Sequence, residues 1–269
     1  AFRCANGHAW PEVDGVRRLI NVEFARTLDP FLSAFSAHRM ANGRIDDPRV
    51  FPGLPESGLA VDRAVWGLRV LDLRLVSELI GDRKALRILD VGAWNGWLSH
   101  RLAALGHRVI ATDVFTDASD GLGAIRRYPV KFTAIQCDQE GLHLLDGPFD
   151  LIIAQRCMGY MTDIPRSIAQ LRSLLAPGGS LLFTGLNIFH DTSRISAHFK
   201  RSSEAFQREH GLPFFFKPVK GYLDRGDERA LTANGVRLLS YPELWHKNAI
   251  ARLLPWKPRY RYGILHNGN

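Results

Sequence analysis

The residues best suited to chemistry lie in a short glycine-bearing turn. The apolar run of residues 86–91 predicts a buried parallel strand, and Gly92 and Gly96 follow it. Glycine lets a backbone bend sharply and lets a ligand approach with no Cβ atom in the way. An amphipathic pattern begins at Trp97 and predicts a helix, whose first N–H groups favour a polar or anionic ligand group. The turn is therefore predicted to bind a ligand.

An acid follows at the end of the next predicted strand. Residues 108–112 predict this strand, and Asp113 comes directly after it, about twenty residues past the turn. In parallel sheets that bind nucleotides, an acid at this position binds the hydroxyl groups of a ribose. Asp113 is therefore predicted to bind a ribose.

The glycine turn resembles motif I of the class I S-adenosylmethionine (SAM)-dependent methyltransferases, an acid-x-Gly-x-Gly-x-Gly pattern. Asp90, Gly92 and Gly96 hold the acidic position and two of the glycine positions, and Trp94 stands where the middle glycine is usual. A nicotinamide-binding turn has the pattern Gly-x-Gly-x-x-Gly, and this chain has no glycine at position 94 or 97. The turn therefore favours SAM over a dinucleotide.

Two further segments carry the resemblance. Asp138 and Gln139 follow a predicted third strand and resemble the family segment whose acid meets the adenine amino group. Residues 175–179 read Leu-Ala-Pro-Gly-Gly, a turn that is frequent in this family before the fifth strand. The matches together span roughly residues 60–185. The resemblance implies SAM as the cofactor, bound by Asp90, Gly92, Ala93, Trp94, Asn95, Gly96, Asp113, Val114, Asp138, Gln139 and Gln155.

The resemblance also implies the fold class, an α/β protein with a doubly wound, seven-stranded, mostly parallel Rossmann-like sheet. Residues 1–58 are predicted as an N-terminal extension that contains a short helical piece at 30–38, and residues 59–269 as the methyltransferase domain. Within that domain, residues 187–230 are predicted as a lid that binds substrate, inserted between the fifth and sixth strands.

The first residues of the extension resemble half of a zinc ribbon. Cys4 and His8 have the spacing of one pair of zinc ligands, as in the ribbon that precedes some bacterial methyltransferases, including ribosomal-RNA guanine methyltransferases. Structural zinc needs four ligands. We therefore expect a remnant without metal, and predict no metal site in the chain. The Asp14–Gly15 pair then predicts a hairpin turn before a short strand.

The composition is ordinary apart from its charge. The 269 residues carry a formal net charge of +8, which permits attraction to nucleic acid, but the basic residues are scattered. No apolar run approaches the length of a membrane span, and no secretory signal is visible. Three widely spaced cysteines form no disulfide framework. We therefore expect a cytoplasmic protein with no membrane partner.

Methyl transfer from a sulfonium is an in-line displacement, so an enzyme mainly aligns the acceptor with the methyl group. A general base is needed when the acceptor must first lose a proton. Tyr160, past the fourth predicted strand, and His190, in the predicted lid, are the candidate catalytic residues. Relatives with a similar turn often carry histidine near position 159, where this chain has Gly159.

The predicted function is transfer of a methyl group from SAM to a small-molecule acceptor of specialised metabolism. Two alternatives remain open. The positive charge and the ribbon-like segment favour a methyltransferase of ribosomal or transfer RNA. Trp94 and Gly159 favour a catalytically silent relative that binds SAM and acts through a partner. We predict that the Trp94 indole lies against the junction of the adenosine and methionine parts of SAM, with core packing as the alternative.

Overall fold

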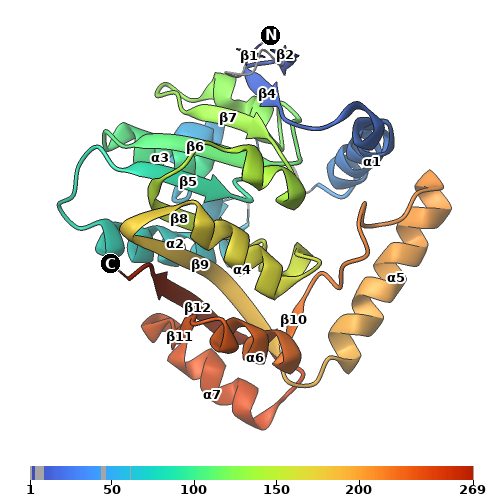
Figure 1. The fold of residues 1–269 in the computed structure, drawn as a ribbon. Helices are drawn as coiled ribbons and strands as arrows, with labels where there is room; N and C mark the ends of the chain where they lie inside the picture. The colour runs from blue at the N-terminus through green and yellow to red at the C-terminus, as the bar shows by residue number, and fades with distance from the viewer. Residues whose placement is uncertain (1, 4–8, 44–46, 61, 269) are drawn as a thin grey trace.

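A ten-stranded, mostly parallel sheet runs through the protein, in a computed structural model that describes residues 2–3, 9–43, 47–60 and 62–268 (Figure 1). Its order is β11-β12-β9-β8-β5-β6-β7-β4-β3, and β10 pairs with β9. The strands are β3 (Glu12–Val13), β4 (Val16–Arg18), β5 (Arg87–Val91), β6 (Arg108–Asp113), β7 (Thr133–Gln136), β8 (Phe149–Gln155), β9 (Leu175–Phe189), β10 (Leu223–Asp224), β11 (Arg237–Ser240) and β12 (Arg259–His266). A separate pair, β1 (Phe2–Arg3) and β2 (Ala9–Trp10), forms a two-stranded sheet.

The predicted α/β class and mostly parallel sheet are confirmed, but the predicted number of seven strands is wrong. Strands β7, β6, β5, β8 and β9 are parallel neighbours, and β12 and β11 continue the sheet in antiparallel pairs. Beyond β7, β4 adds a parallel strand in which Val16 pairs with Ala134. The hairpin turn predicted at Asp14–Gly15 joins β3 to β4. These strands satisfy backbone groups that an open β7 edge would leave unpaired.

Helices cover both faces of the sheet. Helices α2 (Arg63–Ile80) and α3 (Trp97–Ala104) pack in one apolar cluster, and α4 (Ile164–Ser173) and α6 (Arg225–Ala233) pack in another. Neighbouring strand residues belong to different clusters, because successive side chains of a strand point to opposite faces: Ile88 packs with α2 and α3, and Leu89 packs with α4 and α6. The remaining helical elements of the core are α7 (Trp245–Leu253), η1 (Pro48–Gly53), η2 (Ser57–Ala60), η3 (Leu122–Arg127), η4 (Gln139–Leu144), η5 (Met158–Tyr160) and η6 (Pro242–Leu244).

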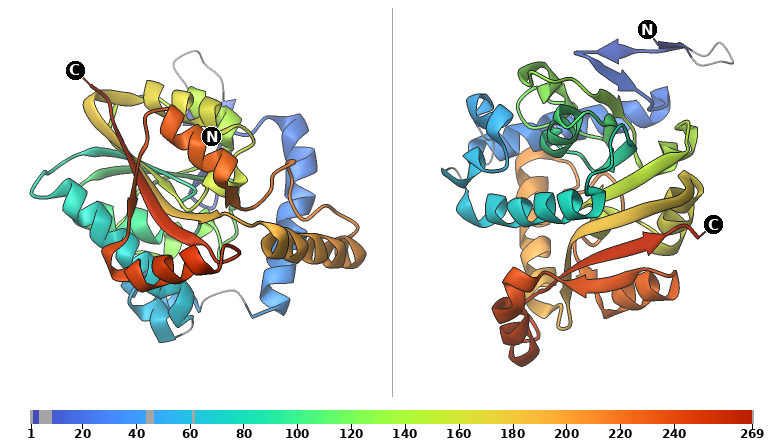
Figure 2. Two further views of the ribbon diagram at one scale, coloured as in Figure 1. Left: turned by 90° about the horizontal axis from the view of Figure 1, so that it is seen from below. Right: turned by 90° about the vertical axis from the view of Figure 1, so that its left-hand side faces the viewer.

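Two helices stand beyond one end of the sheet rather than on its faces. Helix α1 (Val22–Ala41) and helix α5 (Ser193–His210) lie side by side there, as Figures 1 and 2 show from different sides. A third apolar cluster joins them, with Phe31 from α1 and Phe206 from α5 both buried. Phe115, just past β6, packs against the same cluster. The end of the sheet that these helices flank is therefore the one where β6 ends.

Helix α1 corrects the prediction of a short helical piece at 30–38. It runs for 20 residues from Val22, is capped by Asn21, whose side chain accepts the N–H of Phe24, and contains Pro30 in its interior. An interior proline removes one backbone hydrogen bond and destabilises a helix by about 3 kcal/mol. Burial of Leu28 and Phe31 on either side of Pro30 offsets this loss. Among the described residues, no helix combines the length and apolar composition that crossing a membrane requires.

Candidate functional site

The predicted glycine turn leaves β5 at its carboxyl end and leads into α3. Gly92 and Gly96 have φ angles of 72° and 77°, in the left-handed region that favours glycine. A Cβ atom on Gly92 would lie 2.6 Å from Cβ of Cys157, and one on Gly96 would lie 2.3 Å from the ring of Phe132. Both glycines are therefore required by the backbone conformation and by the space around it. Ala93 and Asn95, between them, are buried.

Trp94 takes a left-handed conformation without being glycine, with φ of 53°. Such a conformation costs about 1–2 kcal/mol in an L-residue, and several contacts hold it. Its backbone N–H donates to Asp113 Oδ2 at 2.7 Å, and its indole Nε1 donates to Asp120 Oδ1 at 2.7 Å. The indole stacks on Trp66, with the ring centroids 5.7 Å apart. The guanidinium of Arg69 lies 4.7 Å from the centre of the Trp94 ring. The predicted contact between Trp94 and the cofactor stays a prediction.

Asp113 lies beside the turn, as predicted. Its carboxylate accepts the N–H of Trp94 at 2.7 Å and the N–H of Phe115 at 3.0 Å, one on each oxygen. An ionised carboxylate has about four acceptor positions, so it retains capacity for two hydroxyl donors. Burial raises the pKa of Asp113 above its ordinary value, although these backbone N–H groups favour its charged form. The next residue, Val114, accepts a hydrogen bond through its carbonyl from Gln136 at 2.9 Å.

A buried hydrogen-bond network joins Asp90 to Gln155, two residues assigned to the cofactor. Asp90 is fully buried and accepts bonds from Ser99 Oγ at 2.7 Å and Gln155 Nε2 at 3.2 Å. Gln155 Oε1 in turn accepts the indole N–H of Trp97 at 2.8 Å. Burial raises the pKa of Asp90 to about 7, opposed by these two donors and reinforced by the nearby Asp113. The network ties the end of β8 to the first turn of α3.

The side chains of Asp138 and Gln139 form hydrogen bonds with other parts of the protein. Asp138 Oδ1 accepts the N–H of Gly141 at 3.0 Å, and Oδ2 accepts a hydrogen bond from Lys217 Nζ at 2.6 Å. Gln139 donates its side-chain N–H to Ser167 Oγ. The Asp138 carboxylate therefore carries an ion pair to the segment that follows α5. Its predicted contact with adenine stays a prediction.

The two candidate catalytic residues contact different elements. Tyr160 donates its backbone N–H to the carbonyl of Cys157 at 2.9 Å, and Cys157 is the residue that packs against Gly92. Tyr160 is therefore near the turn, and its ring packs edge-on against Phe215. His190 comes six positions after Thr184, the β9 residue paired with the last residue of β8. His190 is therefore about 20 Å from Thr184 along the direction of β9.

His190 lies beside α6, where its Nε2 is 3.2 Å from Oε2 of Glu228. Burial and the neighbouring Arg259 and Arg225 lower the pKa of His190, so that its neutral form prevails at pH 7. A neutral imidazole can accept a proton. The roles of Tyr160 and His190 in catalysis remain predictions.

Sequence reasoning missed a buried ion pair at the carboxyl end of β8. Arg156 donates to the Asp72 carboxylate at 2.6 and 3.2 Å, and the Tyr241 hydroxyl donates to the same carboxylate at 2.7 Å. The Tyr241 oxygen also accepts the N–H of Gly185 at 2.9 Å. The one sequence signal is that Asp72 stands four residues after Leu68, on the apolar stripe of the sequence that forms α2. This network joins α2, β8 and β9 beside the site.

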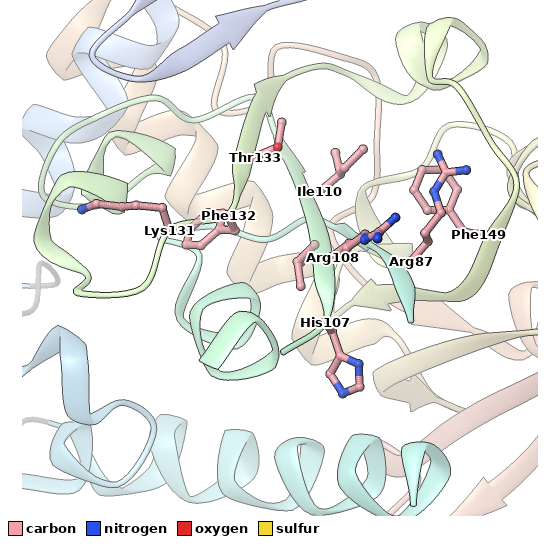
Figure 3. Close-up of a pocket in the computed structure, with 9 residues that line it drawn as sticks. Arg87, His107, Arg108, Ile110, Lys131, Phe132, Thr133 and Phe149 are labelled. Carbon is pink, nitrogen blue, oxygen red and sulfur yellow. The ribbon is translucent and has the colours of Figure 1, made fainter. Parts of the chain in front are cut away.

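The pocket drawn in Figure 3 lies at the amino ends of the parallel strands, opposite to the glycine turn. It has a volume of about 410 Å³ and is lined by Arg87, Arg108, Thr133 and Phe149, which begin β5, β6, β7 and β8. The glycine turn and Asp113 instead lie where strands β5 and β6 end. Ligands of open parallel sheets bind at the carboxyl ends of the strands. The pocket of Figure 3 is therefore not assigned to the cofactor.

The turn, the acid after β6 and the strand order define the class of this protein. The family described as "Methyltransferase domain" matches residues 66–217, more than half of the chain, and the chain belongs to that family. The cofactor of this class is SAM, which agrees with the residues around the turn.

Curated relatives extend this result. A malonyl-[acyl-carrier protein] O-methyltransferase from Erwinia pyrifoliae is 32% identical over 102 residues, which are 38% of this chain and 38% of that protein. A ubiquinone biosynthesis O-methyltransferase from Dinoroseobacter shibae is 30% identical over 109 residues, 39% of this chain and 42% of that protein. The chain thus spans about two fifths of the length of these relatives. Among solved structures, a phosphoethanolamine N-methyltransferase 2 from Haemonchus contortus has a TM-score of 0.49 at 12% identity, covering 81% of this chain and 60% of that chain.

Proposed function

We propose that this protein transfers a methyl group from SAM to a small-molecule acceptor beneath a lid formed by residues 187–230. The observation that carries the proposal is the aromatic contact between the lid and the site. Tyr160 packs against Phe215 of the lid with ring centroids 6.0 Å apart, and Phe115, two residues past Asp113, packs against Phe35 of α1 at 5.2 Å. Aromatic rings near the carboxyl ends of β6 and β8 suit a small acceptor with an apolar part.

The cofactor is assigned to the turn between β5 and α3. Asp113 would accept hydrogen bonds from the two ribose hydroxyls, for which its oxygens have capacity. The first turn of α3 and the Asp90–Gln155 network would face the methionine end of SAM. Trp94, flanked by Trp66 and Arg69, would form a wall of this site. These assignments rest on the turn geometry and on family membership.

The charges near the site favour a small molecule over RNA. Lys217, Arg39 and Arg156 all pair with carboxylates of the protein itself: Asp138, Asp120 and Asp72. RNA binding depends on cations that neutralise phosphates and release counterions. Cations already paired with buried or half-buried carboxylates contribute little to such binding.

Oxygen is the acceptor atom that we test first. The curated relatives named above are both O-methyltransferases by name, and a hydroxyl acceptor must lose its proton during transfer. Tyr160 is beside the turn and is the first candidate to position the acceptor. His190 is the second candidate, as the group that receives the proton: it is neutral at pH 7 but lies about 20 Å along β9 from the end of β8, so it is tested after Tyr160.

Isotope transfer separates this proposal from its alternatives. The protein is incubated with methyl-tritiated SAM and, separately, with a small-molecule extract and with total RNA. The proposal predicts label in a small molecule other than SAM and its breakdown products, and none above background in RNA. Label in RNA, together with binding that weakens steeply with salt, would instead identify an RNA methyltransferase.

A catalytically silent relative is the second candidate, and the engaged Asp138 together with the left-handed Trp94 favours it. Calorimetric titration with SAM and with S-adenosylhomocysteine tests it directly. Binding of both ligands without label transfer to either fraction would support this candidate against the proposed enzyme.

A further inference from the structure

Two histidines and a glutamate meet where α1 packs against the end of α5. His38 lies in the last turn of α1, and Glu209 and His210 are the last two residues of α5. Nδ1 of His38 is 3.2 Å from Oε2 of Glu209, and Nε2 of His210 is 3.5 Å from Oε1 of the same carboxylate. One ligand atom from each residue lies within 4.8 Å of the others.

These separations fit the spacing of ligands around one tetrahedral metal ion. Zinc binds histidine nitrogen and carboxylate oxygen at about 2.0–2.2 Å, which places neighbouring ligand atoms about 3.4 Å apart in a tetrahedron. The nitrogen–oxygen separations, 3.2 Å to Oε2 and 3.5 Å to Oε1 of Glu209, are close to that value, and each joins one histidine to a different oxygen of the carboxylate. Two imidazoles and one carboxylate are also a ligand set that zinc uses when a fourth position is left for water.

The histidine rings are already held in place. Phe206, which is fully buried, packs against His38 with centroids 5.3 Å apart and against His210 at 4.5 Å. Nε2 of His210 is buried and has no hydrogen-bond partner within the described structure. This nitrogen lies 3.5 Å from a carboxylate oxygen and is an unsatisfied buried polar atom, which a cation bound between the two groups would satisfy.

We propose that His38, Glu209 and His210 bind one divalent transition-metal ion of the zinc class. The metal would clamp α1 to the lid helix, since its ligands come from both. It would also fix the part of α1 next to Arg39, whose guanidinium pairs with Asp120 and lies 5.6 Å from the Trp94 ring. This inference does not depend on the identity of the methyl acceptor. The sequence gives no signal for it, because His38 and Glu209 are 171 positions apart.

Zinc titration tests the site. Cys4 and His8, the predicted half of a zinc ribbon, lie outside the described residues and are further possible ligands, so the full chain is used with both replaced, Cys4→Ser and His8→Ala. Isothermal titration calorimetry with zinc chloride should show one ion bound per chain. His210→Ala should weaken binding at least tenfold. The matched control is His198→Ala, which removes an exposed histidine from the same helix and should leave the affinity unchanged.

A second variant and a second probe complete the test. Glu209→Gln keeps the size of the side chain and removes its charge, and it should also weaken zinc binding at least tenfold if a histidine variant fails to fold. Cobalt(II) bound at the site should give the visible absorption of tetrahedral coordination, lost in Glu209→Gln. Absence of zinc binding in the starting protein, or equal affinity in Glu209→Gln and His198→Ala, would show that the three residues form only a hydrogen-bonded cluster.

Discussion

Arg156→Met removes the cation from the buried ion pair with Asp72. Asp72 is fully buried, and it accepts two hydrogen bonds from Arg156 and one from the Tyr241 hydroxyl. Without Arg156 the carboxylate keeps one neutral donor and no opposite charge. An uncompensated buried charge destabilises a protein by about 3–5 kcal/mol. We expect the free energy of unfolding to fall by about that amount.

A double-mutant cycle separates the ion pair from general disruption of the core. Asp72→Asn alone leaves the Arg156 guanidinium without its counter-charge, so it should also destabilise the protein. The double variant, with Arg156→Met and Asp72→Asn, has no unpaired charge, so its loss should be smaller than the sum of the two by about 2 kcal/mol or more. Arg49→Met is the surface control: it removes an exposed ion pair with Asp47 and should leave unfolding unchanged.

Urea unfolding followed by circular dichroism measures the parent protein and the four variants. We expect the free energy of unfolding to fall with urea at the same slope in every protein, so that the transition midpoints report stability directly. A loss of less than about 1 kcal/mol in the free energy of unfolding of Arg156→Met would refute the predicted cost of leaving Asp72 unpaired. Additive losses in the double variant would also refute it, because they would show that the two residues act independently.

Three other predictions concern the turn and its neighbours. Asp113→Ala should weaken S-adenosylhomocysteine binding by roughly 1.5–3 kcal/mol for each ribose hydrogen bond lost; unchanged affinity by calorimetry in a folded variant would contradict the assignment. The pKa of Asp90 is raised to about 7, so the folded protein holds this proton more tightly than the unfolded chain, and stability should fall as pH rises from 4 to 7. Asp90→Asn should remove that part of the pH dependence in urea melts at successive pH values, whereas an unchanged slope would argue against it. Trp94→Gly should reduce the preference for SAM over S-adenosylhomocysteine through loss of a cation–π contact of about 0.5–2 kcal/mol with the sulfonium; equal weakening of both ligands in titrations would reject that contact.

Local sequence patterns were sufficient for the parallel core and for the residues that surround its turn. The strand predicted at 108–112 is β6, which ends one residue later at Asp113, because a short apolar run flanked by turn residues admits few other structures. The approach of Asp113 to Trp94 was also predictable, since both follow neighbouring parallel strands at the same edge of the sheet.

Contacts between segments far apart in the chain could not be predicted from local sequence patterns. Asp72 pairs with Arg156 across 84 positions, and His38 meets Glu209 across 171. Neither pair has a spacing that belongs to a sequence motif, and each forms only when elements from different parts of the chain pack together. The length of α1 was underestimated for a related reason. Proline usually breaks a helix, and only the packing of the aromatic cluster around Phe31 explains why α1 continues through Pro30.

The pairing of β4 with β7 means that β4 can join the sheet only after β7 has been synthesised. Val16 pairs with Ala134, and Arg18 donates a hydrogen bond to Gln136 across 118 positions. At about 5–20 residues per second, a ribosome needs roughly 6–24 s to make the intervening chain. Strand β4 thus has no β7 to pair with during this time, and α1, which follows it in the chain, also lacks the lid helix against which it packs. Among the described strand pairs, β4 and β7 are the farthest apart in sequence, and we expect docking of the first forty residues to be a late step of folding.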